Sequence, residues 1–432
     1  MRERNLGRST AGPMQLDMFQ SAVVRAYSRS ANGQLTNEAL YIEVSQTLGL
    51  SPHEMSAKTP VGSAGTPRSL IKRRIRWAQQ TLKALGLLEP TGVRGQWRTP
   101  QRSEDMPADA PPGAKLVAFS TRLGVAVWAR CESVFPAIGG CMEIAAIITS
   151  PPYLLARPRA YGNPATEREY VEFIVRSLEP LRRHLLPGGS LALNITNDSF
   201  EPGLPSRRTY RERLVLALCD ELDLHKCDEV IWHKTSAAPG PYQWCSRTRQ
   251  QLSASYEPIY IFTPDPKAWF ADNRRVLQPH SDNHRKLIAA GGEQRTAVFS
   301  DGAYRLKPGA FGNATEGAIL RNVWPVGHFD PAAVAMNAFA KARGLQPHGA
   351  PMPYTIAERL VRWLTRPGDL VVDLFAGRLT TAKAAEDNQR RWLATEAIWD
   401  HLVSGATRFG TQLQRGWIPG NIVVDDEGVL LR

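Results

Sequence analysis

Between residues 116 and 412 the chain alternates short, β-branched apolar runs with longer stretches whose apolar positions recur every three or four residues. The apolar runs predict strands at 123–129, 143–150, 189–196, 228–234, 257–263, 369–376 and 390–396. The periodic stretches predict helices between them, notably at 166–186 and 354–365. This alternation is typical of an α/β fold, a doubly wound, Rossmann-like parallel sheet with helices on both faces.

One segment inside this block, at about 265–345, loses the alternation. It is basic, rich in glycine and asparagine, and poor in periodic apolar positions. Because such a sequence is poorly suited to filling a core, we interpret it as an insert that contacts another molecule. The cationic candidates for that contact are Arg274, Arg275, Arg285, Lys286 and Arg305.

A different pattern marks residues 36–101 as a compact helical module. A single helix face would gather Ile71, Ile75, Ala78, Leu82 and Leu85. Gly92 and Gly95 then suit the turn of a hairpin. The cations that lie off the apolar face or on the hairpin are Lys72, Arg73, Arg76, Arg94 and Arg98. This succession of helix, basic helix and basic hairpin resembles a winged helix-turn-helix; the alternative is a small packing module with a solvated basic face.

The remaining segments lack periodicity. Residues 1–35 are polar and irregular and are expected to form a loose leader. Residues 102–115, rich in proline, aspartate and alanine, are typical of a linker, and residues 413–432 are assigned to a C-terminal tail. The division therefore predicts a small N-terminal module joined to one large domain.

The charge balance adds a partner to this picture. Lys and Arg number 53 against 41 Asp and Glu, a formal net charge of +12, which attracts polyanions. No apolar run approaches the roughly 20 residues of a membrane span, and no amphipathic anchor is visible, so nucleic acid is favoured over an anionic membrane. The charged N-terminus predicts no secretory signal. The five cysteines, which form no CxxC pair, predict neither disulfides nor a metal site and favour a cytoplasmic location.

Two corners carry the candidate chemistry. The strand at 143–150 ends in Thr149-Ser150-Pro151-Pro152-Tyr153, where a stiff Pro-Pro backbone follows a hydroxyl and precedes an aromatic ring. The strand at 369–376 leads into Phe375-Ala376-Gly377 and a helix that Thr380 or Thr381 can cap. About twenty residues later Glu396 ends a strand, at the distance where such folds hold ribose hydroxyls. The absence of a GxGxxG motif predicts a nucleoside-like cofactor without a pyrophosphate.

The order of these motifs, SPPY, basic insert, then FxG corner and acid, resembles the permuted, β-class amino-methyltransferases that modify a DNA base with S-adenosyl-L-methionine. The resemblance covers roughly residues 116–412. It implies that Asp373, Phe375, Gly377, Thr380 and Glu396 surround the cofactor, and that residues 348–364 cover its methionine end. It also implies that Ser150, Pro151, Pro152 and Tyr153 form the catalytic corner.

In such a corner the Ser150 hydroxyl and the Pro151 carbonyl would accept the two N–H groups of an exocyclic amine, and Tyr153 would stack on the base. An amine inside a duplex is out of reach, so the base must be flipped out of double-stranded DNA. Tyr256 is either a further stacking residue or a core tyrosine. No Pro-Cys pair is present for methylation at cytosine C5.

Within this family a serine at position 150 usually accompanies cytosine N4 as the target, so a site-specific cytosine-N4 DNA methyltransferase is the leading hypothesis. Adenine N6 or an RNA base is the enzymatic alternative. Leu379 stands where the family's FxGSGTT has its second glycine, which favours a further alternative, an inactive DNA-binding regulator. A cognate restriction endonuclease, the recognised sequence and the oligomeric state are not given by this chain.

Overall fold

The computed structural model describes residues 22–23, 26–27, 30, 34–61, 66–84, 88–98, 109–113, 115–137, 142–154, 164, 166–237, 239–349, 351–414, 423–424 and 430–431. Its centre is a ten-stranded sheet in the order β14-β10-β11-β9-β8-β15-β16-β7-β6-β17. In chain order the strands are β6 (Lys115–Thr121), β7 (Gly124–Ala129), β8 (Ile144–Thr149), β9 (Leu185–Asn194), β10 (His225–His233), β11 (Tyr256–Thr263), β14 (Val323–Pro325), β15 (Leu370–Asp373), β16 (Arg391–Glu396) and β17 (Leu413–Gln414).

The sheet is mixed, which corrects the prediction of a parallel sheet. Its central strands β9, β8, β15, β16 and β7 are parallel, but β11, β10, β6 and β17 join antiparallel to their inner neighbours. The reason at one side is local, because the two residues between β6 and β7 can form a hairpin but not a parallel crossover. β6 itself begins at Lys115, inside the predicted linker.

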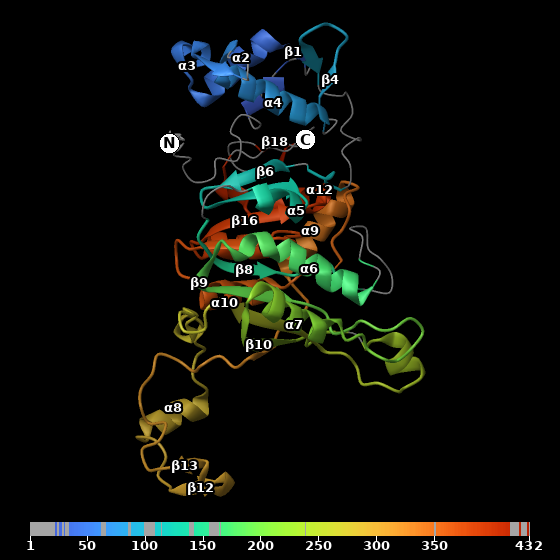
Figure 1. Ribbon diagram of the computed structural model, residues 1–432. Coiled ribbons are helices and arrows are strands. Elements are labelled where there is room, and N and C mark those ends of the chain that lie inside the picture. The colour runs from blue at the N-terminus through green and yellow to red at the C-terminus, as the bar shows by residue number, and fades with distance from the viewer. Residues whose placement is uncertain are drawn as a thin grey trace, which may run out of the picture.

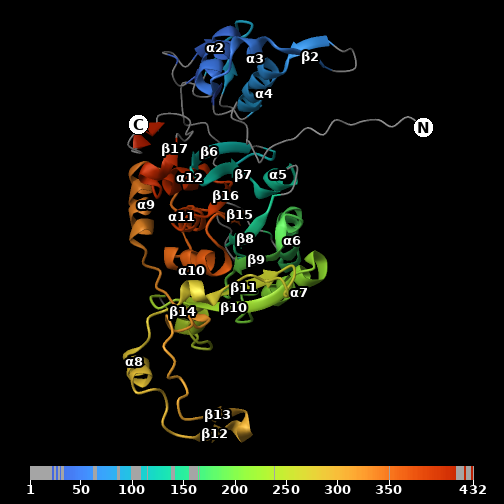
Figure 2. The ribbon, with the colours of Figure 1, turned by 90° about the vertical axis from the view of Figure 1, so that its left-hand side faces the viewer.

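Helices cover both faces of the parallel centre, as predicted (Figures 1 and 2). The short α5 (Cys131–Val134), α6 (Glu167–Arg182) and α7 (Tyr210–Leu222) share one apolar cluster with inward residues of the sheet. Helices α10 (Tyr354–Leu364), α11 (Thr380–Asp387) and α12 (Trp399–Ala406) share the other. Successive β8 residues alternate between the two clusters, Ile147 on the first and Ile148 on the second, as a strand buried on both faces requires.

The N-terminal module packs around its own core. Its elements are β1 (Gln34–Thr36), α2 (Asn37–Leu48), α3 (Pro52–Ser56), β2 (Lys58–Val61), β3 (Thr66–Ser69), α4 (Leu70–Ala84), β4 (Glu89–Pro90) and β5 (Gln96–Arg98). Ile75, Ala78 and Leu82 of the predicted helix face are fully buried, whereas Leu85 lies outside the described residues. Gly92 and Gly95 have positive φ in the turn between β4 and β5. The hairpin of β2 and β3 was not predicted.

Within the predicted insert, α8 (Asp282–Ala289), β12 (Ala297–Phe299) and β13 (Tyr304–Leu306) project from the end of the body opposite the N-terminal module (Figures 1 and 2). The chain then returns, because β14 pairs in parallel with β10 and α9 (Pro331–Ala342) contacts α12. Near the C-terminus, β18 (Val423–Val424) pairs with β19 (Leu430–Leu431). No helix in the described ranges is long and apolar enough to cross a membrane.

Candidate active site

The two corners meet because β8 and β15 are neighbouring parallel strands, although more than 200 residues separate them in sequence. Parallel strands place their carboxyl ends at one edge of a sheet, so Ser150 and Leu374 emerge side by side. The Thr149 hydroxyl donates to Oδ1 of Asp373 at 2.7 Å, and the Phe375 N–H donates to the same oxygen at 3.2 Å. These contacts fix the SPPY corner against the FxG corner.

A pocket opens directly above this junction. Its lining combines the SPPY residues, the FxG turn and the end of β16 with residues from other elements: Asp109, Ala129, Arg130, Cys131, Glu132, Ser150, Pro151, Pro152, Tyr153, Phe173, His348, Leu374, Phe375, Gly377, Glu396, Ala397 and His401. The sequence predicted seven of these as site residues, namely Ser150, Pro151, Pro152, Tyr153, Phe375, Gly377 and Glu396. The structure therefore brings them together around one cavity.

Glu396 and Gly377 form one wall of this pocket. Oε2 of Glu396 accepts from the Gly377 N–H at 2.7 Å, and Oε1 accepts from the Ile398 N–H at 2.8 Å. Gly377 has φ +49°, and a Cβ there would lie 2.8 Å from Nε2 of His348. Both the backbone conformation and the space therefore favour glycine. Nε2 of His401, buried in the same pocket, makes no hydrogen bond with the described residues.

Asp373 ends β15 and Thr380 begins α11, and neither lines the pocket. Asp373 is 5% exposed, and this burial raises the pKa of its carboxyl from 3.8 to about 6, against the opposing effect of hydrogen bonds from Thr149, Thr381 and the Phe375 N–H. Thr380 is the first residue of α11 and is buried. Neither threonine caps that helix, because the N-cap is Leu379, which provides no side-chain hydrogen bond. The predicted threonine cap was therefore wrong.

Leu379 takes the conformation that its Cβ disfavours. Its φ is 60° and its ψ is 33°, so the turn keeps the left-handed residue that a glycine would supply. The side chain is fully buried in the apolar cluster. A left-handed leucine costs about 1–2 kcal/mol, whereas burying a leucine side chain contributes about 1.5–3 kcal/mol, so packing offsets the backbone strain.

The preceding residue, Arg378, is also buried, with 1% of its surface exposed. None of its guanidinium nitrogens has a hydrogen-bond partner among the described residues, and burial lowers its pKa to about 10.

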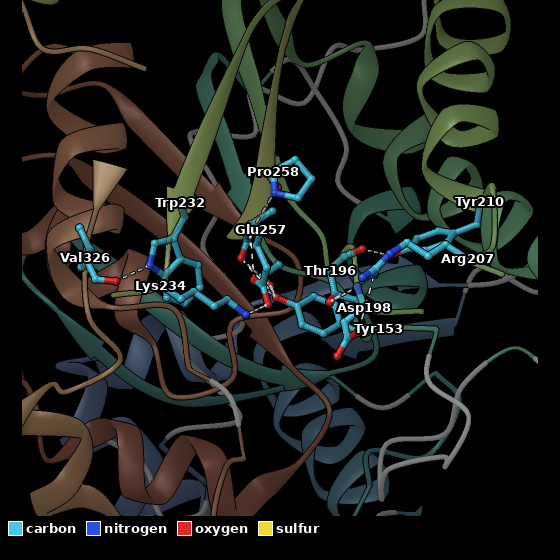
Figure 3. A network of polar contacts seen from close by, with 12 residues as sticks. Tyr153, Thr196, Asp198, Arg207, Tyr210, Trp232, Lys234, Glu257, Pro258 and Val326 are labelled. Carbon is cyan, nitrogen blue, oxygen red and sulfur yellow. Dashed lines mark hydrogen bonds and ion pairs between the residues drawn. The ribbon is translucent and has the colours of Figure 1, made fainter. Parts of the chain in front are cut away.

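At the SPPY wall of the pocket, Tyr153 takes part in a polar network (Figure 3). Its hydroxyl donates to Oε2 of Glu257 at 2.9 Å and lies 3.2 Å from the Ser150 hydroxyl. Oδ1 of Asn194, at the end of β9, lies 3.4 Å from the Ser150 hydroxyl and 3.3 Å from that of Tyr153. Glu257 is 4% exposed and forms an ion pair with Lys234. Sequence reasoning missed Asn194, Lys234 and Glu257, although an acid opening the apolar strand at 257–263 was a visible signal.

A second cavity shares Lys234 with this network. It is lined by Asn197, Asp198, Lys234, Ser236, Ala237, Gly240, Ala254, Tyr256 and His328. Tyr256 is 38% exposed there, so it is not a core tyrosine. No group of three His, Cys, Asp or Glu within the described part of the chain could hold a metal ion.

The predicted DNA contacts fall into two groups. Seven of these cations are exposed: Arg73, Arg94, Arg98, Arg274, Arg285, Lys286 and Arg305. Among them, Arg98 pairs with Glu89, Arg274 with Asp272 and Arg285 with Asp282. Lys72 and Arg76 are half-buried, Lys72 near Glu38 at 3.8 Å and Arg76 bonded to Asn37 and Gln79.

Arg275 differs from its neighbours. Its guanidinium donates to the carbonyls of Trp363, Thr365 and Phe270 at 3.2–3.3 Å, so it fastens the base of the insert to α10. These three bonds, made by partly buried guanidinium nitrogens, set Arg275 apart from the exposed cations.

Comparisons with known proteins agree with this geometry. Residues 144–403 match a family model described as DNA methylase, and residues 18–106 match the model of the Mrr N-terminal domain. The Type II methyltransferase M.PvuII of Proteus hauseri is 28% identical over 269 residues, 62% of this chain and 78% of that protein.

One solved structure shares the fold. The PvuII DNA methyltransferase, described as cytosine-N4-specific, superimposes with a TM-score of 0.52 at 23% identity, covering 68% of this chain and 89% of that chain. A putative DNA modification methylase from Thermus thermophilus, solved with S-adenosyl-L-methionine, gives a TM-score of 0.42 at 19% identity over 68% and 94% of the two chains. Because the family match spans more than half of the residues and includes both corners, the protein belongs to the DNA methylase family.

Proposed function

We propose that this protein is a site-specific DNA methyltransferase that methylates the exocyclic N4 of a flipped-out cytosine. Membership of the DNA methylase family makes DNA the substrate and S-adenosyl-L-methionine the methyl donor.

The pocket fits the methyl donor by the chemistry of its lining. Glu396 offers carboxylate oxygens to ribose hydroxyls, and Phe375 and Phe173 offer apolar surface to an adenine ring. The unbonded Nε2 of His401 is a polar group that a ligand can satisfy. When bound, the donor supplies an electrophilic methyl group. Asp373 and Thr380 would act by holding the turn in shape.

The opposite wall of the pocket suits the base. An exocyclic amine is a weak nucleophile because its lone pair is delocalised into the ring. Acceptors for its two N–H groups favour a more sp³-like nitrogen and aim the lone pair at the methyl group. The Ser150 hydroxyl and the Pro151 carbonyl are suited to this role, and the stiff Pro151-Pro152 backbone keeps them in place. The observation that carries the proposal is that Ser150 shares one pocket with Glu396 and Gly377.

Cytosine is proposed as the base because serine opens the SPPY corner. The likeness to M.PvuII, and the cytosine-N4 specificity printed for the solved PvuII enzyme, support that choice. Adenine N6 is the alternative product. The inactive-regulator hypothesis is disfavoured because Leu379 keeps the left-handed turn.

DNA would be held at two places. The N-terminal module, proposed to be a winged helix, carries the exposed Arg73 and Arg94, and the insert carries Lys286 and Arg305. Such cations bind phosphates and position the duplex, while the base-flipping cost of a few kcal/mol is offset by contacts in the pocket.

The test is nucleoside mass analysis of duplex DNA and of RNA incubated with the protein and S-adenosyl-L-methionine. We expect N4-methylcytosine in DNA and an unmodified RNA sample. N6-methyladenine as the sole product would overturn the cytosine assignment, and calorimetry without heat of S-adenosyl-L-methionine binding, with DNA binding retained, would favour a regulator.

A further inference from the structure

A buried acid outside the predicted catalytic corner reaches that corner through a continuous set of hydrogen bonds. Glu257, at the start of β11, accepts from Tyr153 (Figure 3). The hydroxyl oxygen of Tyr153 in turn contacts the hydroxyl of Ser150. Ser150 lines the pocket, whereas Glu257 does not. Glu257 therefore acts on the pocket through the residues it contacts, Tyr153 and Asn194.

The ion pair of Glu257 with Lys234 determines which group donates in each of these hydrogen bonds. An ionised carboxylate paired with Lys234 accepts hydrogen bonds and cannot donate them. Tyr153 must therefore donate its single proton to Glu257, which leaves its oxygen lone pairs for Ser150. Burial keeps the pKa of Tyr153 well above its ordinary value, so the phenol remains a neutral donor.

Asn194 supports the same direction at Ser150. Its Nδ2 donates to Glu257 and to the carbonyl of Pro258, both at 3.4 Å, which turns Oδ1 toward the hydroxyls of Ser150 and Tyr153. Ser150 thus faces two acceptors, Oη of Tyr153 and Oδ1 of Asn194. Its proton points inward, and its lone pairs are left for the pocket.

We propose that Glu257 is a positioning residue that, through Tyr153, makes the Ser150 hydroxyl an acceptor and then receives the proton released by methyl transfer. The inference rests on the proposed function but extends it. It requires a substrate that presents an N–H donor to Ser150, and both cytosine N4 and adenine N6 do so.

The proton balance closes within this set of residues. As the N–C bond forms and the S–C bond of the donor breaks, the sulfonium becomes a neutral thioether and the amine nitrogen becomes cationic. That nitrogen passes a proton to Ser150, Ser150 passes its own to Tyr153, and Tyr153 passes its own to the Glu257 carboxylate. Glu257 ends as a neutral acid. The positive charge lost by the sulfonium and the negative charge lost by the Glu257 carboxylate therefore cancel.

The experiment compares single-turnover methyl transfer to duplex DNA by the full chain with Tyr153→Phe, Glu257→Gln and the double variant. Tyr153→Phe keeps the ring and the Glu257–Lys234 ion pair, so it tests the hydroxyl without unpairing a buried charge. We expect each single variant to lower kcat about 100-fold or more, because general-base assistance contributes about 10²- to 10⁴-fold. The Kd for S-adenosyl-L-methionine and the KM for DNA should stay within about twofold.

Two further comparisons separate this role from a structural one. The double variant should be about as slow as the slower single variant, since both changes interrupt one path. Tyr260→Phe, which removes a buried hydroxyl from the same strand, is the matched control and should keep the wild-type kcat.

Tyr153→Phe with wild-type kcat would overturn the inference and leave the ring as a stacking surface, and multiplicative losses in the double variant would overturn the shared path. Wild-type transfer to adenine would instead overturn the proposed base and leave the inference standing, because the variant ratios are taken on whichever amine is methylated.

Discussion

Asp373→Asn should make the protein more stable at neutral pH, and by an amount that depends on pH. Burial raises the pKa of this carboxyl from 3.8 to about 6. A raised native pKa means that the folded state favours the protonated form, a contribution fully present below pH 3.8 and lost as pH rises through 6. From the difference between these two pKa values, ionisation of the buried carboxyl lowers the free energy of unfolding by about 3 kcal/mol at pH 8 and by about 1.6 kcal/mol at pH 5.

Asparagine keeps an oxygen to accept from Thr149 and the Phe375 N–H. Asparagine also lacks the second carboxylate oxygen, which weakens the hydrogen bond from Thr381. This loss reduces the gain in stability by about 1 kcal/mol at both pH values. Urea unfolding followed by tryptophan fluorescence should therefore show a gain of about 2 kcal/mol at pH 8. The gain should shrink by about 1.4 kcal/mol at pH 5.

The matched control is Asp301→Asn, at an exposed residue in the turn between β12 and β13. Its substitution should produce no comparable difference between the two pH values. A gain for Asp373→Asn that is equal at pH 8 and pH 5 would refute the reasoning, because then burial would not be penalising the charge.

Three further outcomes follow from the site and the module. Ser150→Ala should lower kcat about 10- to 100-fold while the Kd for S-adenosyl-L-methionine stays within about twofold by calorimetry, and equal losses in both would contradict its role. Deleting residues 1–101 should weaken DNA binding and flatten its salt dependence without affecting cofactor binding, and unchanged DNA affinity would show that the basic helix is only a solvated surface. Leu379→Gly should be more stable than Leu379→Ala by about 1 kcal/mol in urea, although both are less stable than wild type; the reverse order would contradict the strain assigned to φ 60°.

The local motifs predicted the two corners well because each is continuous in sequence. Ser150 and Phe375 follow apolar strands that the pattern located to within a few residues, and the alternation placed helices on both faces of the sheet. The family model then confirmed the family inferred from those motifs. The parallel order of β8 and β15 explains how two continuous signals come to share one pocket.

The contacts that the sequence could not predict depend on pairing between distant segments. Arg274 and Arg275 are neighbouring arginines that the sequence does not distinguish. Only Arg275 donates to the carbonyls of Trp363 and Thr365, because α10 packs beside it. Glu257 looked like the polar end of a strand until the antiparallel pairing of β11 with β9 brought it to Asn194. The strand β14 has three residues, too few for a periodic signal.

The adjacency of β8 and β15 has an evolutionary consequence. Sheet hydrogen bonds, and not the intervening chain, hold the two corners together, so the segment with α8, β12 and β13 can change in length or sequence while the reaction centre keeps its geometry. Lengthening such a loop costs little, since closure entropy grows only with the logarithm of loop length. Lineages with this architecture can therefore exchange this one segment while inheriting the two corners intact.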